Sequence, residues 1–301
     1  MGPKTGSSII SGDERGATQV LLDALETGFA AIRGVGWEWE TDTRTRAPPA
    51  NYPRGRFIFE HISWIVVEVL MVDAVSVYIR TTPVGKFPSQ ERLVDAPLYL
   101  GCFRAVLLFL QSRWYMDLLY RCSAVIGMAI WNPSLFPPLF GSWREAYTVR
   151  RFWGYTWHQM MRSLAQYPVN ALASGLRIRR GSYLSNYFKV SGSFFITYAM
   201  HGYGTHVAGG NHMSDFWWCF WQVAAIFVEE RVIEIGQRLG IKESGATWAA
   251  GYAWNALVMA LTCRLWIDEG ASMGAYAKPP LGFSPLNVVL VTFGLAKTTR
   301  T

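Results

Sequence analysis

The sequence predicts an all-α protein, a polytopic transmembrane helical bundle of about five to seven spans with additional interfacial helices. Hydrophobic residues make up 51% of the 301 residues, and charged residues only 16%, against roughly 25% in an average soluble domain. The apolar residues also gather in long blocks without charge, above all Val190–Ser214 and Ser244–Cys263. Each block can supply the run of about 20 apolar residues that crosses a bilayer. A soluble all-helical protein with buried helices is the alternative.

The first part of the chain is expected to be a polar N-terminal segment and loop, residues 1–56, and the rest, residues 57–301, a single transmembrane domain. Met1–Arg15 is rich in Gly and Ser and lacks the apolar core of a signal peptide. The prolines of Thr41–Arg56 indicate an exposed loop. Membrane insertion is therefore expected to depend on internal spans.

Weaker candidate spans lie at Phe57–Ile79, Leu98–Leu110 and Phe216–Val228, and charged residues interrupt the first two. In lipid, such charges are costly unless they face protein or reach the interface. The block Cys122–Trp143 contains three prolines, so only about Cys122–Trp131 is expected to be regular helix. Residues 279–296 form a candidate short C-terminal span. The charged residues in the weaker candidates include Glu60, Glu68, Asp73 and Arg104.

Basic residues are concentrated between residues 144 and 189, where only Glu145 opposes them. This segment alone accounts for the net charge of +7. A basic segment between spans is expected on the cytoplasmic side of the membrane, where arginine side chains can bind a phosphorylated cytosolic ligand. Nucleic acid is not expected as a partner, because apolar blocks flank the segment. The basic residues are Arg144, Arg150, Arg151, Arg162, Arg177, Arg179, Arg180 and Lys189.

Two short strings contain the candidate site residues. The string at residues 152–159 reads Phe-Trp-Gly-Tyr-Thr-Trp-His-Gln. Its aromatic residues suit an anchor at the membrane interface, but His158 and Gln159 need polar partners or a function at that depth. The second string ends in His201, near the middle of the longest uncharged block. Imidazole titrates near neutral pH and suits proton transfer, although a structural, hydrogen-bonded His201 is the alternative.

No metal site is expected. His201 and His206 are five residues apart, which places them about 140° apart around a helix. His212 follows His206 after six residues and again lies off that face. Four scattered cysteines without C-x-x-C spacing add neither a zinc site nor a disulfide framework. These are Cys102, Cys122, Cys219 and Cys263.

Three strings give the chain a resemblance to a known family. They are Arg33-Gly-Val-Gly-Trp-Glu-Trp-Glu40, Ser142-Trp-Arg-Glu145 followed by Arg151-Phe-Trp153 and Trp157-His-Gln159, and the apolar run that ends in His201. In sequence and order they are similar to motifs of the fungal, wax-synthase-like branch of the membrane-bound O-acyltransferases. Fungal proteins of this kind often acetylate terpenoid or meroterpenoid metabolites.

The resemblance implies transfer of an acyl group, here expected to be acetyl, from acyl-CoA to a hydroxyl of a lipophilic acceptor. His201 is then the expected general base, and His158 the group that interacts with the thioester carbonyl. Acyl-CoA is expected as co-substrate without any bound cofactor, and the protein as a multi-pass protein of the endoplasmic reticulum membrane. The expected substrate-binding residues are Phe152, Trp153, Trp157, Gln159 and Arg162.

Two other functional classes remain open at this point. One is a terpenoid isomerase or cyclase on the same scaffold, in which the two histidines transfer protons without CoA. The other is a membrane protein that has the fold but no catalytic activity.

Overall fold

The computed structural model describes residues 45–49 and 51–293, and this part of the chain is helical, without strands. The predicted all-α fold class is therefore confirmed for the described residues. The strings and segments within residues 1–44, including Arg33 to Glu40, lie outside them, as do residues 294–301. The long helices are α2 (Arg54–Thr81), α3 (Leu98–Gly127), α6 (Tyr183–Val207), α7 (Met213–Arg238) and α8 (Gly245–Ser272).

Shorter elements connect these helices. Several of them lie between α3 and α6, in the segment that contains the first candidate string. The short elements are η1 (Pro83–Gly85), η2 (Pro133–Leu135), η3 (Trp143–Glu145), α4 (Val149–Arg151), the π-helical turn η4 (Phe152–Thr156), α5 (Arg162–Gly175) and α9 (Pro285–Thr292).

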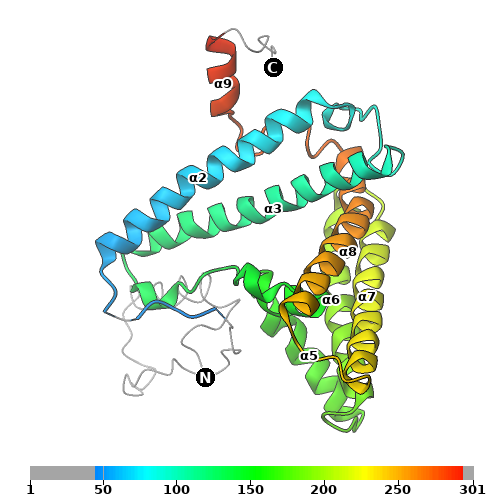
Figure 1. Ribbon diagram of the computed structural model, residues 1–301. Coiled ribbons are helices and arrows are strands. Elements are labelled where there is room, and N and C mark those ends of the chain that lie inside the picture. The colour runs from blue at the N-terminus through cyan, green and yellow to red at the C-terminus, as the bar shows by residue number, and fades with distance from the viewer. Residues whose placement is uncertain (1–44, 50, 294–301) are drawn as a thin grey trace.

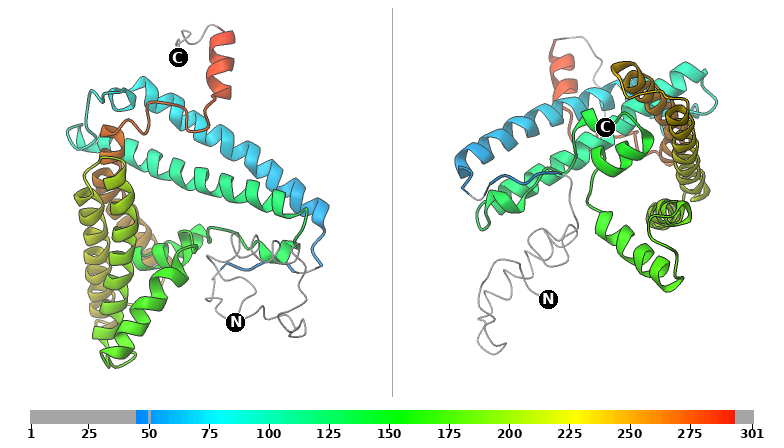
Figure 2. Two further views of the ribbon diagram at one scale, coloured as in Figure 1. Left: turned by 180° about the vertical axis from the view of Figure 1, so that it is seen from behind. Right: turned by 60° about the horizontal axis from the view of Figure 1, so that its bottom comes forward.

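The helices form two groups that meet at one end of the molecule (Figure 1). In one group α2 and α3 pack against each other, and in the other α6, α7 and α8 run side by side, with α5 against α6 (Figures 1 and 2). The groups are joined where α3 packs on α8. The largest buried core lies at this junction and combines side chains of α2, α3, α8 and residues 139–157. The candidate string therefore belongs to the core.

The helix α3 corrects one expectation. Leu98–Leu110 and Cys122–Trp131 were expected as separate segments, but α3 runs unbroken from Leu98 to Gly127. The charged residues between these segments do not interrupt the helix, because Arg121 donates to Glu68 of α2 at 3.1 Å and to Asp117 at 2.8 Å. Burial among protein partners is the arrangement that makes such charges tolerable.

The remaining apolar blocks become helices with shifted ends, and Val190–Ser214 covers the larger part of α6, the turn after it and the start of α7. Ser182 and Ser244 cap the N-termini of α6 and α8, accepting hydrogen bonds from backbone N–H groups of the first turn. The described part of the C-terminal candidate contains the eight-residue α9. Within the described residues, α2 alone meets both the length and the apolarity required of a membrane-crossing helix.

Candidate active site

Residues 144–151 are fixed by α7 and α8. The buried carboxylate of Glu229, on α7, accepts hydrogen bonds from the backbone N–H groups of Val149 at 2.7 Å and Arg150 at 3.2 Å. The hydroxyl of Thr148 accepts a third, from Arg151, at 3.0 Å. These acceptors satisfy the N–H groups that a helix leaves unpaired at its first turn. Glu229 thus holds the start of the helical turn that leads to His158.

The same segment touches α8 closely. Asn255 donates to the backbone carbonyl of Ala146 at 2.8 Å, and the Tyr252 hydroxyl donates to that of Arg144 at 2.7 Å. A Cβ at Gly251 would lie 2.1 Å from the carbonyl oxygen of Tyr147. A glycine at this position allows the helix to approach the loop backbone this closely.

The next residues form a π turn followed by a sharp exit from the helix. The backbone N–H of Trp157 closes the turn by donating to the carbonyl of Phe152 at 2.8 Å. The loop 139–142 then packs alongside, with Gly141 N–H donating to Thr156 O at 3.0 Å and Gln159 N–H to Leu139 O at 3.4 Å. Single π turns are rare and frequently lie at functional sites.

Gln159 and Arg162 stabilise this exit. The buried amide of Gln159 donates to the carbonyl of Trp157 at 2.8 Å and accepts from Arg162 at 3.0 Å. Arg162 also donates to the carbonyl of Gly154 at 3.3 Å. Both side chains were expected to bind substrate. Within the protein, their contacts hold the loop on either side of His158.

His158 is half-buried against aromatic rings. Its ring lies 5.6 Å from that of Trp157 and edge-on to Phe140 at 6.0 Å. Trp157 in turn stacks on Phe109 of α3 at 4.4 Å. Trp157 and the neighbouring Phe152 are buried, with 8% and 2% of their surfaces exposed. Trp157 therefore backs His158, and Phe152 packs against Trp157 at 5.6 Å.

His201, on α6, reaches the same aromatic rings from the other side. It lies edge-on to Trp266 of α8 at 5.6 Å and to Trp218 of α7 at 6.3 Å, and these two indoles stack at 4.8 Å. Its own side chain is exposed. One side of the imidazole thus contacts indole rings, and another side is accessible to a ligand.

Two chains of ring contacts connect the histidines. Trp266 lies edge-on to Phe109 at 6.5 Å, and Trp153 lies 5.5 Å from Trp218 and 5.6 Å from Trp157. We call these five rings the aromatic cluster: Phe109, Trp153, Trp157, Trp218 and Trp266. The two strings found in the sequence therefore meet at one cluster, although His158 and His201 are 43 positions apart in the sequence.

Buried polar residues anchor the cluster, and sequence reasoning missed them. Trp153 Nε1 donates to Gln222 at 3.0 Å, and Gln222 donates to Thr262 at 2.6 Å. Trp266 Nε1 donates to Asp215 at 2.9 Å. Gln222 and Asp215 are almost fully buried. The sequence signal that could have identified Gln222 and Asp215 is a polar residue within or next to an apolar block.

His206 and His212 lie elsewhere. The helix α6 continues through Gly202 and Gly204 to Val207, so His206 falls on another face than His201. Its ring contacts that of His212 at 5.8 Å. Among the described residues, no group of three or more His, Cys, Asp or Glu is placed to hold a metal ion.

A match to a family model covers this site. Residues 136–222, which include both histidines and most of the aromatic cluster, match the membrane bound O-acyl transferase family. This part of the chain is therefore similar to a family of membrane-bound transferases. The expected family resemblance is confirmed.

Curated relatives are fungal transferases. The chain is 30% identical to acetyltransferase ple2 of Rhodocybe pseudopiperita, over 82% of this chain and 65% of that protein. It is 26% identical to acetyltransferase sirH of Leptosphaeria maculans, over 82% and 63%. It is also 26% identical to O-mevalon transferase macI of Penicillium terrestre, over 81% and 59%. The aligned region thus spans about three-fifths of the length of these relatives. No solved structure matches the chain.

Proposed function

We propose that this protein is a membrane-embedded O-acyltransferase that moves an acyl group, specifically acetyl, from acyl-CoA to a hydroxyl of a lipophilic, terpenoid-type acceptor. The observation that carries the proposal is that His158 and His201, from separate segments, lie on one aromatic cluster. The names of the fungal relatives support the reaction type.

In this mechanism a ring nitrogen of His201 accepts the proton of the acceptor hydroxyl while its oxygen attacks the thioester carbonyl. A positioned base contributes about 10²- to 10⁴-fold in rate. His158 donates a hydrogen bond to the carbonyl oxygen, on which negative charge develops. The new C–O bond forms, the C–S bond breaks, and the CoA thiolate receives the proton held by His201. The exposed side of His201 supports access for the acceptor.

The surface of the helices supports a position inside the bilayer. Soluble monomers rarely expose large contiguous apolar patches, yet α2 and α7 carry rows of exposed apolar side chains. These include Phe59, Ile62, Trp64, Val66, Val67 and Leu70 on α2, and Trp217, Phe220, Trp221, Val228 and Val232 on α7. We therefore keep the proposal of a multi-pass bundle, in the membrane of the endoplasmic reticulum.

The distribution of charge supports an orientation. The α5–α6 and α7–α8 turns lie at the end of the bundle away from α2 (Figures 1 and 2). Exposed basic residues gather there, whereas the α6–α7 turn at the other end, residues 208–212, carries no Lys or Arg. By the positive-inside rule the basic end faces the cytosol, which is also where acyl-CoA is available. The basic residues are Arg177, Arg179, Arg180, Arg238 and Lys242.

Insertion of an Asn-x-Thr acceptor beside Arg179 is expected to leave the protein unglycosylated in microsomes. The reason is that the oligosaccharide is attached only on the lumenal side, and this turn is proposed to be cytosolic. The same acceptor placed at Gly209, in the α6–α7 turn, is the matched control and should be glycosylated. Glycosylation near Arg179 would invert the proposed orientation.

Membranes that contain the protein are expected to transfer label from labelled acetyl-CoA to an ester of a terpenoid alcohol. The measurement is mass spectrometry of the extracted products, with membranes lacking the protein as control. Product without label and with unchanged mass would contradict acyl transfer and indicate isomerisation. Absence of any product across a panel of acceptor alcohols and acyl donors would contradict an enzymatic role.

A further inference from the structure

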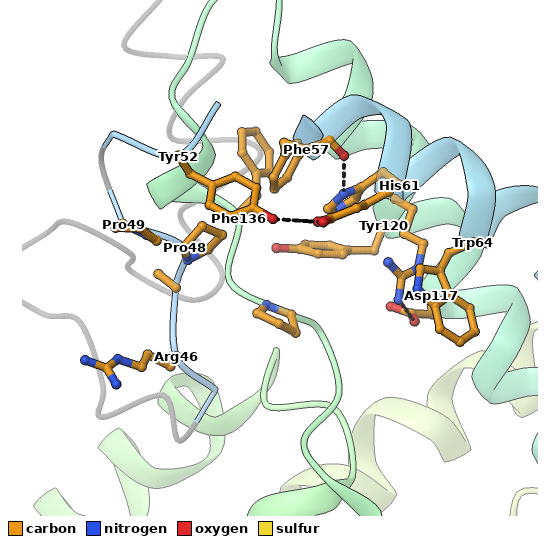
Figure 3. A pocket seen from close by; sticks show the side chains of 14 residues that line it. Arg46, Pro48, Pro49, Tyr52, Phe57, His61, Trp64, Asp117, Tyr120 and Phe136 are labelled. Carbon is orange, nitrogen blue, oxygen red and sulfur yellow. Dashed lines mark hydrogen bonds and ion pairs between the residues drawn. The ribbon is translucent and has the colours of Figure 1, made fainter. Parts of the chain in front are cut away.

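A cavity lies apart from the two histidines, between α2, α3, the residues before α2 and the segment that follows α3. It has a volume of about 880 Å³, within the range of about 300–1,000 Å³ that holds small molecules. Figure 3 shows its wall, with Tyr52 and Pro48 across from His61 and Tyr120. Aromatic rings and prolines dominate the wall: Pro48, Pro49, Tyr52, Phe57, Trp64, Tyr120, Phe136 and Pro138.

Most polar groups of this wall already have partners within the protein. The Tyr52 hydroxyl donates to Glu60 at 2.8 Å, and the Tyr120 hydroxyl donates to the backbone carbonyl of Pro137 at 2.6 Å. Arg121 is paired with Asp117 and with Glu68 behind the wall. The formal charges on the wall also balance, with Arg46 and Arg121 against Glu60 and Asp117. An aromatic wall without excess charge favours a neutral ligand.

His61 supplies the polar group that can orient such a ligand. Its ring stacks on Phe57 at 3.8 Å, and its Nδ1 lies 2.9 Å from the carbonyl oxygen of Phe57. Because a carbonyl oxygen only accepts, Nδ1 carries the proton. In the neutral ring Nε2 is then a hydrogen-bond acceptor, and none of the described residues donates to it.

We propose that this cavity binds a neutral, ring-containing alcohol whose hydroxyl donates to Nε2 of His61. A hydroxyl is the neutral group that matches a fixed acceptor, and stacked rings match the aromatic walls. Two ligands share this chemistry, the lipophilic acceptor of the reaction and a membrane lipid of sterol type. The identification of the ligand as the acceptor rests on the proposed function. The binding of a neutral ring-containing alcohol in this cavity does not.

The chain that forms the wall also continues into the active site. Phe136 and Pro138 line the cavity, and two residues later Phe140 lies edge-on to His158. Leu139 between them accepts from the backbone of Gln159. A ligand in the cavity therefore contacts the segment that positions His158, without sharing the aromatic cluster.

The test is photolabelling of the purified full-length chain in detergent with a diazirine sterol and with the same sterol lacking its hydroxyl. No acyl donor is present, so the result does not depend on turnover. We expect saturable labelling of cavity residues on α2 and α3, with the hydroxylated probe bound about tenfold more tightly, the effect of one good hydrogen bond. Unsaturable labelling, spread over the outer faces of the helices, would overturn the proposal.

Variants of His61 test whether the hydroxyl of the probe binds to this residue. His61→Phe keeps a ring on Phe57 but removes the acceptor, so both probes are expected to bind equally. His61→Gln restores an acceptor and should recover part of the preference for the hydroxyl. His206→Phe is the matched control, since His206 lies outside the cavity, and should bind as the unchanged protein does. An undiminished preference in His61→Phe would show that the hydroxyl is bound elsewhere.

The transfer assay then separates the two ligand sources. If the cavity holds the acceptor before its hydroxyl moves on to His201, the sterol competes with it, and His61→Phe raises KM with little change in kcat. If a membrane lipid occupies it, turnover continues at saturating sterol. Failure of all turnover, with labelling intact, would reject the proposed function and retain the binding site.

Discussion

Replacement of His201 by alanine is expected to reduce acyl transfer by at least about 10²-fold, the smallest usual contribution of a general base. His201 is exposed on one side and packed edge-on to Trp266 and Trp218 on the other. Its removal deletes the proton acceptor without exposing a buried polar partner. The measurement is specific activity per folded protein, together with the thermal unfolding midpoint. His158→Ala is expected to cause a large but incomplete loss, since the base remains.

His206→Ala is the internal control for this result. His206 sits on the same helix, five residues later, but its ring contacts His212 and not the aromatic cluster. It should retain nearly full activity. A loss of activity in this variant, with His201→Ala active, would transfer the role of base to His206. If His201→Ala loses thermal stability but keeps its rate per folded molecule, the histidine is structural.

The sequence was sufficient to find the histidines because each stands out against an apolar or aromatic background. The 3.6-residue periodicity also separated His201 from His206 correctly, since α6 continues past both. What no local pattern could show was that His158 and His201 share the aromatic cluster. One of the two chains of ring contacts between them runs through Phe109 of α3 and Trp266 of α8, residues with no distinguishing neighbours in the sequence.

Helix boundaries were harder to predict where charges pair across helices. Arg121 and Asp117 separate two apolar stretches in the sequence, yet α3 is continuous because Glu68 of another helix completes the ion pairs. The same limitation hid Glu229. A carboxylate at the end of an apolar block resembles a solvent-exposed terminus, and only the fold reveals that it accepts hydrogen bonds from the backbone of Val149 and Arg150.

Gly141→Ala is expected to impair acyl transfer almost as severely as His201→Ala, although residue 141 has no side chain that could take part in the chemistry. A Cβ at this position would lie 1.8 Å from the carbonyl oxygen of Tyr155, far inside van der Waals contact. A backbone oxygen cannot rotate away as a flexible side chain can. The loop must therefore separate from the π turn, with loss of the hydrogen bond from Gly141 N–H to Thr156 O.

This separation should move His158, because the same pair of segments is joined again where Gln159 N–H donates to Leu139 O. We expect a loss of about 1–3 kcal/mol in the free energy of unfolding, typical of overpacking, and a fall in kcat larger than the fall in folded protein. Gly204→Ala is the matched control: nothing lies within 4 Å of its Cβ position, and alanine favours a helix over glycine. That variant should be as stable as the unchanged protein or more so. Normal kcat in Gly141→Ala would show that the contact between the two loops does not position His158.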